Sequence, residues 1–414
     1  MPLLRTPWYH GWTVVAVAVV YQALIFGIAI YSFTFWIPYW EEEFAVGRAD
    51  IMIIFVCLQA GMAILSPFVG RAADSYSIRW LVIAGGMCFS ASLVASSYAE
   101  SLWQIGIIFC VLMVPGLVLA GPVTALTLAA RWFDRNSGMA LGVVSTGTSI
   151  GGLLLPLIIV SLQTELGWRI ANLWLAGFVL LLITPLSFLI YNSPSNAGLG
   201  TDKSTDQLVD TGSDNSSHAS SLWTTRQILG TSTFWAMVFC FAVVTAIFLA
   251  IQQNLAPLAQ DGGISVAAAS SIVSIMAFVM IGAKLLFGYY ADRIKHRILY
   301  LVTVGTLVAV LLILSFMPID YLTLLVASCL SGVAAGSVIP LIGAIIRHRY
   351  GPLSFGRVKG LTLAFVNVSA LGPWIAGAIY DSTGTYSMAW VVLGVALVPA
   401  ALASFKLSQS GWRA

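Results

Sequence analysis

The chain alternates long apolar runs with short polar or charged clusters, and the runs have the length of membrane-spanning helices. A helix needs about twenty predominantly apolar residues to cross the hydrocarbon core of a bilayer. Twelve runs between the charged clusters reach that length, which predicts an all-α membrane protein with twelve transmembrane helices. The runs lie at about 11–39, 50–70, 79–98, 103–130, 137–161, 168–191, 234–259, 265–290, 298–317, 321–346, 357–380 and 386–407.

One long polar stretch divides the predicted helices into two groups of six. It lies within residues 192–230 and is rich in Ser, Asp, Gly and Thr, a composition that cannot bury a core. We interpret it as a cytoplasmic linker with a short interfacial helix near Leu222–Ile228. The predicted organisation is an N-terminal six-helix bundle at 1–191, the linker at 192–230 and a C-terminal six-helix bundle at 231–414.

The composition restricts the class of protein. Of 414 residues, 59% are hydrophobic and only 8% are charged, too few charges for a soluble protein of this length. A net charge of +3 gives no reason to expect a nucleic-acid partner. The five cysteines lie in apolar runs without disulfide or metal-ligand spacing, so we interpret them as small core residues and expect no metal or cofactor. They are Cys57, Cys88, Cys110, Cys240 and Cys329.

The distribution of Lys and Arg predicts the orientation. An even number of spans places both termini on one side, and almost all basic residues outside the spans fall on that side. Only Arg48 and Arg169 fall opposite. The positive-inside rule therefore predicts cytoplasmic termini and a multi-pass protein of the cytoplasmic (inner) membrane. The acidic residues gather on the far side: Glu41, Glu42, Glu43, Glu100, Glu165 and Asp261.

Two short loops repeat one pattern. GRAADSYSIR follows span two and GYYADRIKHR follows span eight, with Asp74 and Asp292 218 positions apart. A second landmark, RWFDRNSGMALG and RYGPLSFGRVKG, repeats at an offset of 222. Two similar offsets indicate an internal duplication of the six-helix unit.

The repeated G-x-x-x-D loop resembles the signature of the major facilitator superfamily. The glycine lets two helices approach closely, and the aspartate can neutralise a helix N-terminus while it pairs with an arginine. Both contacts can form only when the cytoplasmic side is closed. The alternative is an ordinary charged turn that sets topology. The candidate gating residues are Gly70, Asp74 and Arg79 in the first copy and Gly288, Asp292 and Arg293 in the second.

Further motifs narrow the resemblance. HGW at the head of span one, RWF-x4-G-x-A-x-G ending at Gly142, and GP-x7-G-x11-GP-x3-G-x3-D from Gly351 to Asp381 are similar to the monocarboxylate transporter family and its bacterial oxalate/formate-type relatives. The resemblance implies transport of small carboxylates by alternating access between two six-helix bundles. In the proton-coupled members a proton accompanies the carboxylate.

Lys284 lies inside the eighth predicted span, where a lysine costs about 2.5–3.5 kcal/mol on insertion scales. We therefore expect it to face a cavity and to bind an anion. The alternative is that its ammonium extends to the cytoplasmic interface or to Asp292. By resemblance, the family places an arginine at this position. It also has an aspartate where this chain has Met280, and a span-one lysine where this chain has Ile30–Tyr31, in its animal members.

Apart from Asp50, the first residue of the second run, no Asp, Glu or His falls within the predicted spans, which bears on coupling. This pattern argues against proton or sodium symport of neutral sugars and against export of organic cations, which usually needs a buried acid. We expect the negative charge of the substrate to occupy the Lys284 site. A proton would then travel on the substrate or on Lys284, or one anion would exchange for another.

Other polar residues within spans are candidates for the lining of a substrate cavity. For each one alone, a hydrogen bond between helices is the favoured explanation. Tyr31, Gln253 and Asn254 are favoured because spans one and seven line the cavity in the superfamily that the sequence resembles. The candidate substrate-binding set is Lys284, Tyr31, Gln253, Asn254, Asn367 and Thr124.

The sequence therefore predicts a secondary active transporter for a small organic anion, above all a monocarboxylate, working as a monomer in the bilayer by proton symport or anion exchange. One rival is an efflux carrier for amphipathic small molecules, in which Lys284 is a structural charge. A non-transporting sensor or an enzyme is disfavoured, because the sequence contains no soluble domain and no nucleophile–base or metal constellation.

Overall fold

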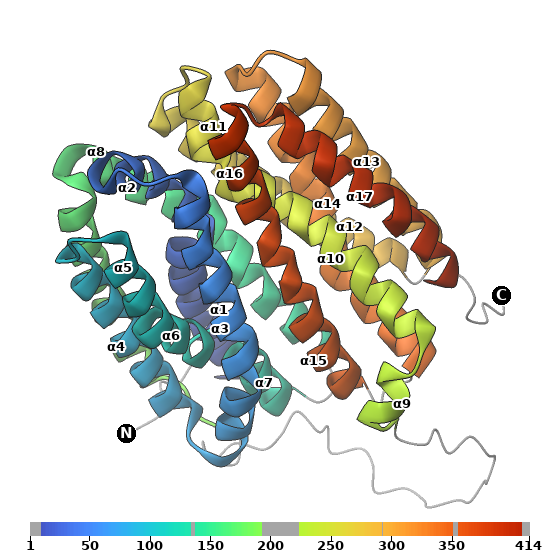
Figure 1. The fold of residues 1–414 in the computed structure, drawn as a ribbon. Helices are drawn as coiled ribbons and strands as arrows, with labels where there is room; N and C mark the ends of the chain where they lie inside the picture. Colours follow the sequence, from blue (N-terminus) through green and yellow to red (C-terminus); the bar gives the residue numbers. More distant parts are fainter. Residues whose placement is uncertain (1–9, 134–136, 193–222, 292, 351–354, 408–414) are drawn as a thin grey trace, which may run out of the picture.

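The computed structural model describes residues 10–133, 137–192, 223–291, 293–350 and 355–407. Every regular element in these ranges is helical, as the apolar runs predict. Helices α1 to α8 lie beside helices α10 to α17, and most helices of both groups run lengthwise through the molecule (Figure 1). The all-α prediction is confirmed, and the two groups are called the first and second half below.

The first half begins with α1, which continues into a π-helical turn at Gly27–Tyr31 and a 3-10 turn at Phe33–Phe35. A second π-helical turn, Phe109–Met113, joins α5 to α6. The α-helices of this half are α1 (His10–Phe26), α2 (Ile37–Phe44), α3 (Arg48–Ser75), α4 (Ile78–Ser97), α5 (Leu102–Ile108), α6 (Val114–Leu119), α7 (Pro122–Trp132) and α8 (Ser137–Ser187).

The second half has a parallel arrangement. A short helix, α9, precedes it, and 3-10 turns at Asn367–Ala370 and Ser404–Leu407 follow α15 and α17. Its helices are α9 (Thr225–Leu229), α10 (Ser232–Gln253), α11 (Leu255–Asp261), α12 (Val266–Ala291), α13 (His296–Phe316), α14 (Tyr321–Tyr350), α15 (Phe355–Val366), α16 (Leu371–Thr383) and α17 (Ser387–Ala403).

Twelve helices cross the molecule, although only 11 helical stretches of the described residues qualify by length and composition as membrane spans. One of these stretches, Gly142–Ser187 within α8, is 46 residues long and contains two spans. They meet at Gly167, whose φ of 76° lies in the left-handed region that glycine adopts without strain. The predicted boundary between spans five and six, at 161–168, falls at this break.

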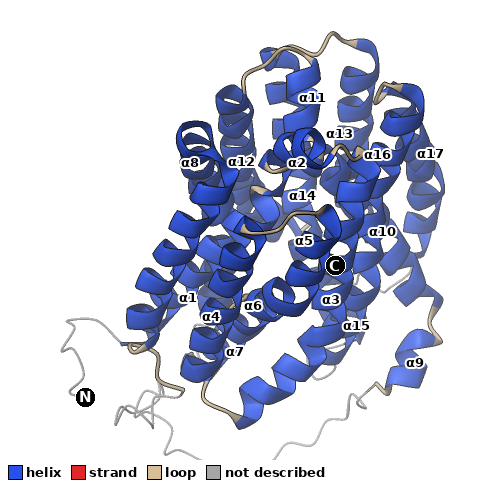
Figure 2. Cartoon of the chain, turned by 60° about the vertical axis from the view of Figure 1, so that its left-hand side comes forward, coloured by secondary structure: helices blue, strands red, loops and turns tan. Residues whose placement is uncertain are grey.

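The first predicted span, 11–39, is too long. The apolar helical path stops at Tyr31, and α2 starts separately at Ile37. Pro38 lies at the start of α2. Proline favours this position because the first N–H groups of a helix have no carbonyl partner within it, so the missing N–H of proline costs no hydrogen bond. Figures 1 and 2 place α2 and α11 at one end of the molecule, called the α2–α11 end, and α9 at the opposite end, called the α9 end.

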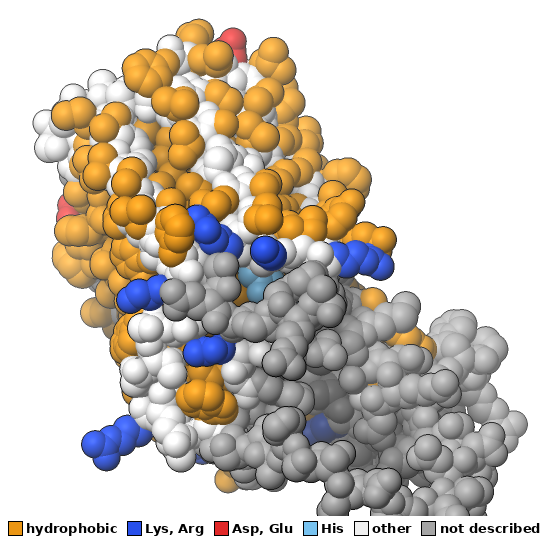
Figure 3. Space-filling model, turned by 90° about the vertical axis from the view of Figure 1, so that its right-hand side faces the viewer, with side chains coloured by type: hydrophobic (Ala, Val, Ile, Leu, Met, Phe, Trp, Pro, Cys, Tyr) orange, Lys and Arg blue, Asp and Glu red, His pale blue; other side chains and the backbone are white. Residues whose placement is uncertain are grey.

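Apolar side chains cover much of the outer surface as well as the core. Exposed large residues follow α13 and α17, among them Leu312, Val395 and Leu402. On this face hydrophobic side chains cover most of the upper part, and Lys and Arg gather below them (Figure 3). An apolar exterior of this extent is the expected lipid contact surface of a membrane protein.

The cysteines make no disulfide, but they are not all core residues. Cys57 and Cys110 are exposed, and only Cys240 is fully buried. The prediction of five core cysteines is therefore wrong for the two exposed ones. An apolar run does not separate core from surface in a protein whose surface is itself apolar.

The residues of α9, Thr225–Leu229, largely overlap the short helix predicted near residues 222–228. Much of the predicted linker, residues 193–222, lies outside the described residues. The domain boundaries at 191 and 230 therefore stay predictions.

Candidate functional site

Lys284 lies where the two halves meet, on the part of α12 that packs against α8. Its Nζ donates a hydrogen bond of 2.7 Å to the Oγ of Ser149, a fully buried residue of α8 in the other half. The ammonium therefore points between the halves and not toward the lipid surface. The salt bridges among the described residues do not include Lys284.

Tyr31 lies beside this pair. Its hydroxyl donates to the Sδ of Met280 at 3.8 Å and also interacts with Ser149. Met280 precedes Lys284 by one helical turn, so both project on the same side of α12. The ring of Tyr31 packs so closely against Gly152 that a Cβ at this position would overlap the ring carbons. Glycine at position 152 is therefore what lets the ring lie against α8.

Gln253, at the end of α10, is connected to the same region. Its Nε2 donates to the carbonyl oxygen of Ile30 at 3.0 Å, across the two halves and next to Tyr31 in the chain. The Oε1 of Gln253 is buried without a protein hydrogen bond, as is the Nε2 of Gln252. Unsatisfied buried amides are costly, so these two atoms are candidates for contact with a ligand or water.

Asn254 lies apart from Lys284 in this structure, and its predicted role as a substrate ligand stays a prediction. Its Nδ2 donates to the carbonyl oxygens of Ala250 and Pro373, and its Oδ1 accepts a hydrogen bond of 3.1 Å from the hydroxyl of Tyr386. These bonds hold the corner between α10 and α11. They connect Asn254 to the α2–α11 end and not to Lys284.

Thr124 and Asn367 are also separate from Lys284 in the described structure. Thr124 is fully buried, and its Oγ1 donates to the carbonyl oxygen of Gly121, which directly precedes α7. Asn367 is half-buried at the start of a 3-10 turn. The hydrogen bonds of the described residues link neither side chain to Lys284, so their predicted roles as substrate ligands stay predictions.

The repeated loops show no tight contact at their glycines. A Cβ on Gly70 would lie 4.0 Å from Val123, an ordinary contact, and a Cβ on Gly288 would meet open space. The side chain of Asp74 and all of Asp292 lie outside the described residues. The predicted gating contacts, which require the cytoplasmic side to be closed, therefore stay predictions.

The two loop arginines bind within their own halves. Arg79 donates from Nε and Nη2 to the carbonyl oxygen of Ile190, at 3.0 and 2.7 Å. The guanidinium of Arg293 lies 3.5 Å from the centre of the Tyr289 ring. Each arginine is thus placed by a local partner in this conformation.

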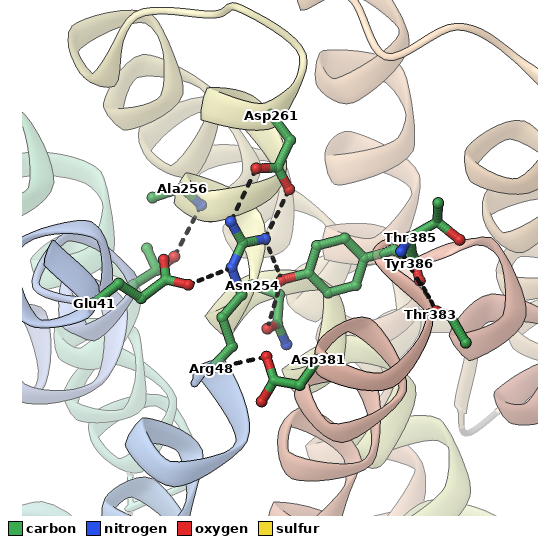
Figure 4. A network of polar contacts seen from close by, with 10 residues as sticks. Glu41, Arg48, Asn254, Ala256, Asp261, Asp381, Thr383, Thr385 and Tyr386 are labelled. Carbon is green, nitrogen blue, oxygen red and sulfur yellow. Dashed lines mark hydrogen bonds and ion pairs between the residues drawn. The ribbon is translucent and has the colours of Figure 1, made fainter. Parts of the chain in front are cut away.

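Two features of the interface were not predicted from the sequence. Ser149 does not stand out, because serines are common in membrane helices and usually bond to a carbonyl of their own helix. Arg48 counts in the sequence only as a charge on the far side. In the structure its side chain is 6% exposed and binds Glu41, Asp261 and Tyr386 (Figure 4). The G-x3-D spacing that ends at Asp381 was the available signal.

Glu41 of this cluster lies outside the membrane spans, on α2. Its removal from water raises the pKa of the carboxyl group, although Arg48 beside it acts in the opposite direction. Among the described residues no group of three His, Cys, Asp or Glu side chains could hold a metal ion.

The chain folds into two halves of six helices, and polar side chains line the interface between them. This architecture is typical of membrane transporters that work by alternating access. The family model of the Major Facilitator Superfamily matches residues 19–319 and 253–411, and the chain belongs to this superfamily. The family and the fold are those of transporters that move solutes across membranes.

Curated relatives carry the name that the motifs suggested. The chain is 27% identical over 398 residues to monocarboxylate transporter 11 of Homo sapiens, covering 93% of this chain and 80% of the relative. It is 26% identical over 416 residues to monocarboxylate transporter 12 of Rattus norvegicus, covering 94% and 83%. An uncharacterized MFS-type transporter of Bacillus subtilis, YcxA, is 25% identical over 363 residues, covering 86% and 85%. The predicted resemblance to the monocarboxylate transporter family is confirmed.

Solved structures confirm the fold. The chain is similar to a bacterial homolog of the human lysosomal transporter Spinster in its inward-facing, occupied conformation, with a TM-score of 0.74 and 16% identity, covering 97% of this chain and 98% of that one. The unoccupied form gives a TM-score of 0.75, covering 99% of both chains.

Proposed function

We propose that the protein transports a small organic anion, above all a monocarboxylate, and that Lys284 binds its carboxylate. The observation that supports this proposal is a membrane lysine whose ammonium points between the halves and donates to a neutral hydroxyl at 2.7 Å. A cation in a low-dielectric interior is stable only when it gains an anion or sheds its proton. A carboxylate substrate supplies that anion.

The arrangement also suits alternating access. Lys284 belongs to the second half, whereas Ser149 and Tyr31 belong to the first half. A carboxylate held between them contacts both halves at once and can stay bound while the halves rock about it. The hydroxyls of Ser149 and Tyr31 are suitable donors to the second carboxylate oxygen.

The change from arginine to lysine affects how the substrate is held. An ammonium is a point charge with three rotatable donors, whereas a guanidinium grips a carboxylate with two fixed parallel bonds. We expect a broader range of small carboxylates than a bidentate site accepts. The buried amides of Gln252 and Gln253 provide polar groups for a hydroxy or keto substituent.

We place the α9 end in the cytoplasm, because the basic loops lie on that side, and assign the protein to the cytoplasmic membrane. The proposed transport unit is a monomer. Proton symport and anion exchange are both compatible with a lysine site, since a proton can travel on the substrate or on Lys284.

Uptake by proteoliposomes tests the proposal. Wild type, Lys284→Ala and Lys284→Arg are reconstituted at equal density and supplied with labelled lactate, pyruvate, formate and oxalate, each with and without a pH gradient or an internal anion. We expect uptake of at least one carboxylate by wild type, loss of that uptake in Lys284→Ala and partial retention in Lys284→Arg. Equal flux in wild type and Lys284→Ala would remove Lys284 from the mechanism.

A thermal-shift screen separates the anion transporter from the amphipathic efflux carrier. Ligands that bind the folded state raise its melting temperature in proportion to the logarithm of their concentration. We expect carboxylates to raise the melting temperature of wild type and not that of Lys284→Ala. Stabilisation of both proteins by amphipathic cations or neutral compounds alone would favour the efflux carrier.

A further inference from the structure

Several hydrogen bonds join the two halves at the α2–α11 end or next to it. They involve the start of α3, the turn at Phe33–Phe35 and Ile30 from the first half. Their partners come from α10, α11, α16 and Tyr386. Specific polar contacts thus join the two halves at the α2–α11 end.

Arg48, the first residue of α3, makes most of these contacts. Its Nη1 and Nη2 donate to the two carboxylate oxygens of Asp261 at 2.7 and 2.9 Å, a bidentate pair across the halves. Nη1 also donates to the hydroxyl of Tyr386 at 2.9 Å. The guanidinium carbon lies 3.9 Å from the centre of the Tyr380 ring. Bidentate, partly buried pairs of this kind are the strong ones.

Glu41, which belongs to the same half as Arg48, also binds the guanidinium. Its Oε1 accepts a hydrogen bond of 2.8 Å from the Nε of Arg48. Because Glu41 and Arg48 belong to the same half, this bond can persist when Asp261 moves away. In this structure the guanidinium lies between Glu41 and Asp261 (Figure 4). Arg48 would therefore keep one partner after Asp261 has moved away.

The backbone of α3 is bound at the same point. Its N-cap is Gly47, which has no side chain to accept from the first amides of the helix. Asp381 of α16 accepts instead, at 3.1 Å from the N–H of Arg48 and 2.8 Å from the N–H of Ala49. The second half thus caps a helix of the first half, with a favourable charge–dipole interaction.

Two glycines permit this approach. A Cβ on Gly47 would lie 2.6 Å from the Oδ2 of Asp381, and a Cβ on Gly377 would lie 3.1 Å from the backbone nitrogen of Ala49. α3 and α16 are therefore in near-backbone contact, which larger residues at these positions would prevent. The glycine and aspartate of the sequence G-x3-D at positions 377–381 both serve the contact.

We propose that Arg48 and the first turn of α3 form a latch that holds the α2–α11 end closed by binding Asp261, Tyr386 and Asp381 of the other half. The latch releases as one unit when that end opens. It concerns the movement of the halves and does not depend on which solute is carried, so it can be tested without a substrate.

The test is the rate at which a hydrophilic thiol reagent modifies a cysteine behind the latch, in detergent, in a background whose native cysteines are replaced. Thr34→Cys is the probe, because Thr34 is fully buried and accepts a hydrogen bond of 2.9 Å from the N–H of Ala256 in the other half. We expect Arg48→Gln and Asp261→Asn each to accelerate modification about tenfold or more, since one partner of a buried charge pair is removed. The double variant should react no faster than the faster single variant.

Arg169→Gln is the matched control. Arg169 is the other basic residue on the far side in the sequence, and its partners Glu43, Ser97 and Ala99 all belong to its own half. We expect no change in the modification rate. A second control uses Cys240 as the single cysteine, because it is fully buried within the second half and reports general unfolding.

Three results would overturn the latch. One is an unchanged rate at Thr34→Cys in both Arg48→Gln and Asp261→Asn. Another is an equal acceleration by Arg169→Gln. The third is a parallel acceleration at Cys240, which would show that Arg48→Gln loosens the whole protein and does not specifically open one end.

Discussion

Lys284 and Arg48 are two cations at the same interface, and their surroundings differ in one decisive respect. Arg48 is bound by the carboxylates of Glu41 and Asp261, whereas the hydrogen-bond partner of Lys284 is a serine hydroxyl. A buried cation that already has its own counter-ions is compensated within the protein and serves structure. A half-buried charge without them gains most from an anion that binds and leaves. The comparison favours closure as the role of one region and substrate binding as the role of the other.

The largest effect should be on stability, at Arg48. Arg48→Ala leaves Glu41 and Asp261 partly buried without their counter-charge, and breaking such a pair costs about 3 kcal/mol, the lower end of the usual range because both acids retain some exposure. We expect a clear fall in the melting temperature of the detergent-solubilised protein. Arg169→Ala provides the comparison, because its site is more exposed and should show a smaller loss.

Gly377→Val should open the α2–α11 end by steric means alone. The added carbons would meet the backbone of Ala49, which cannot move aside as a side chain can. We expect faster modification of Thr34→Cys, by several-fold and less than in Arg48→Gln. Gly305→Val in α13 is a suitable control, because a Cβ there meets nothing within 4 Å. Equal rates in the two glycine variants would contradict a close contact between α3 and α16.

Ser149→Ala should weaken substrate binding moderately. It removes the hydroxyl that orients the Lys284 ammonium but leaves the charge, and a hydrogen bond to a charged group is worth about 1.5 kcal/mol net. We expect the apparent KM for a transported carboxylate to rise about tenfold, with a smaller change in maximal rate. Ser145→Ala, one turn earlier, is the control, since the hydroxyl of Ser145 donates to the carbonyl of Gly142 in its own helix.

The smallest effect should be on the stability of Lys284→Met, which sharpens the contrast with Arg48. Methionine keeps a similar length and removes a charge that the described residues do not neutralise, so little stabilisation is lost. We expect a melting temperature equal to or above that of wild type, in a protein that no longer transports. A fall as large as that of Arg48→Ala would mean that Lys284 is a structural charge.

Much of the fold could be predicted from hydropathy, because insertion of a helix into lipid depends on local sequence. Twelve apolar runs correspond to twelve helices, and even the junction at Gly167, inside the long helix α8, is marked in the sequence by the polar residues around Glu165. The first run was extended too far, because α2 is also rich in aromatic residues. Lys284 could be singled out for the same reason as the helices: a charge within an apolar run has a cost that sequence reveals.

The latch could not be predicted in this way. Arg48 and Asp381 are 333 residues apart, and nothing in the sequence links the one to the other. Their meaning depends on how the halves fit together, which local patterns do not encode. Asn254 illustrates the same limit, because its place in span seven does not reveal that its side chain bonds to Pro373 and Tyr386.

The capping of α3 by the opposite half gives the protein a natural reporter of its own state. The backbone amides of Arg48 and Ala49 are bonded to Asp381 only while the two halves touch. When they part, both hydrogens pass to water and become free to exchange with deuterium. Hydrogen–deuterium exchange of the peptide that begins α3, read by mass spectrometry, therefore measures how often the α2–α11 end opens, without any mutation or attached probe.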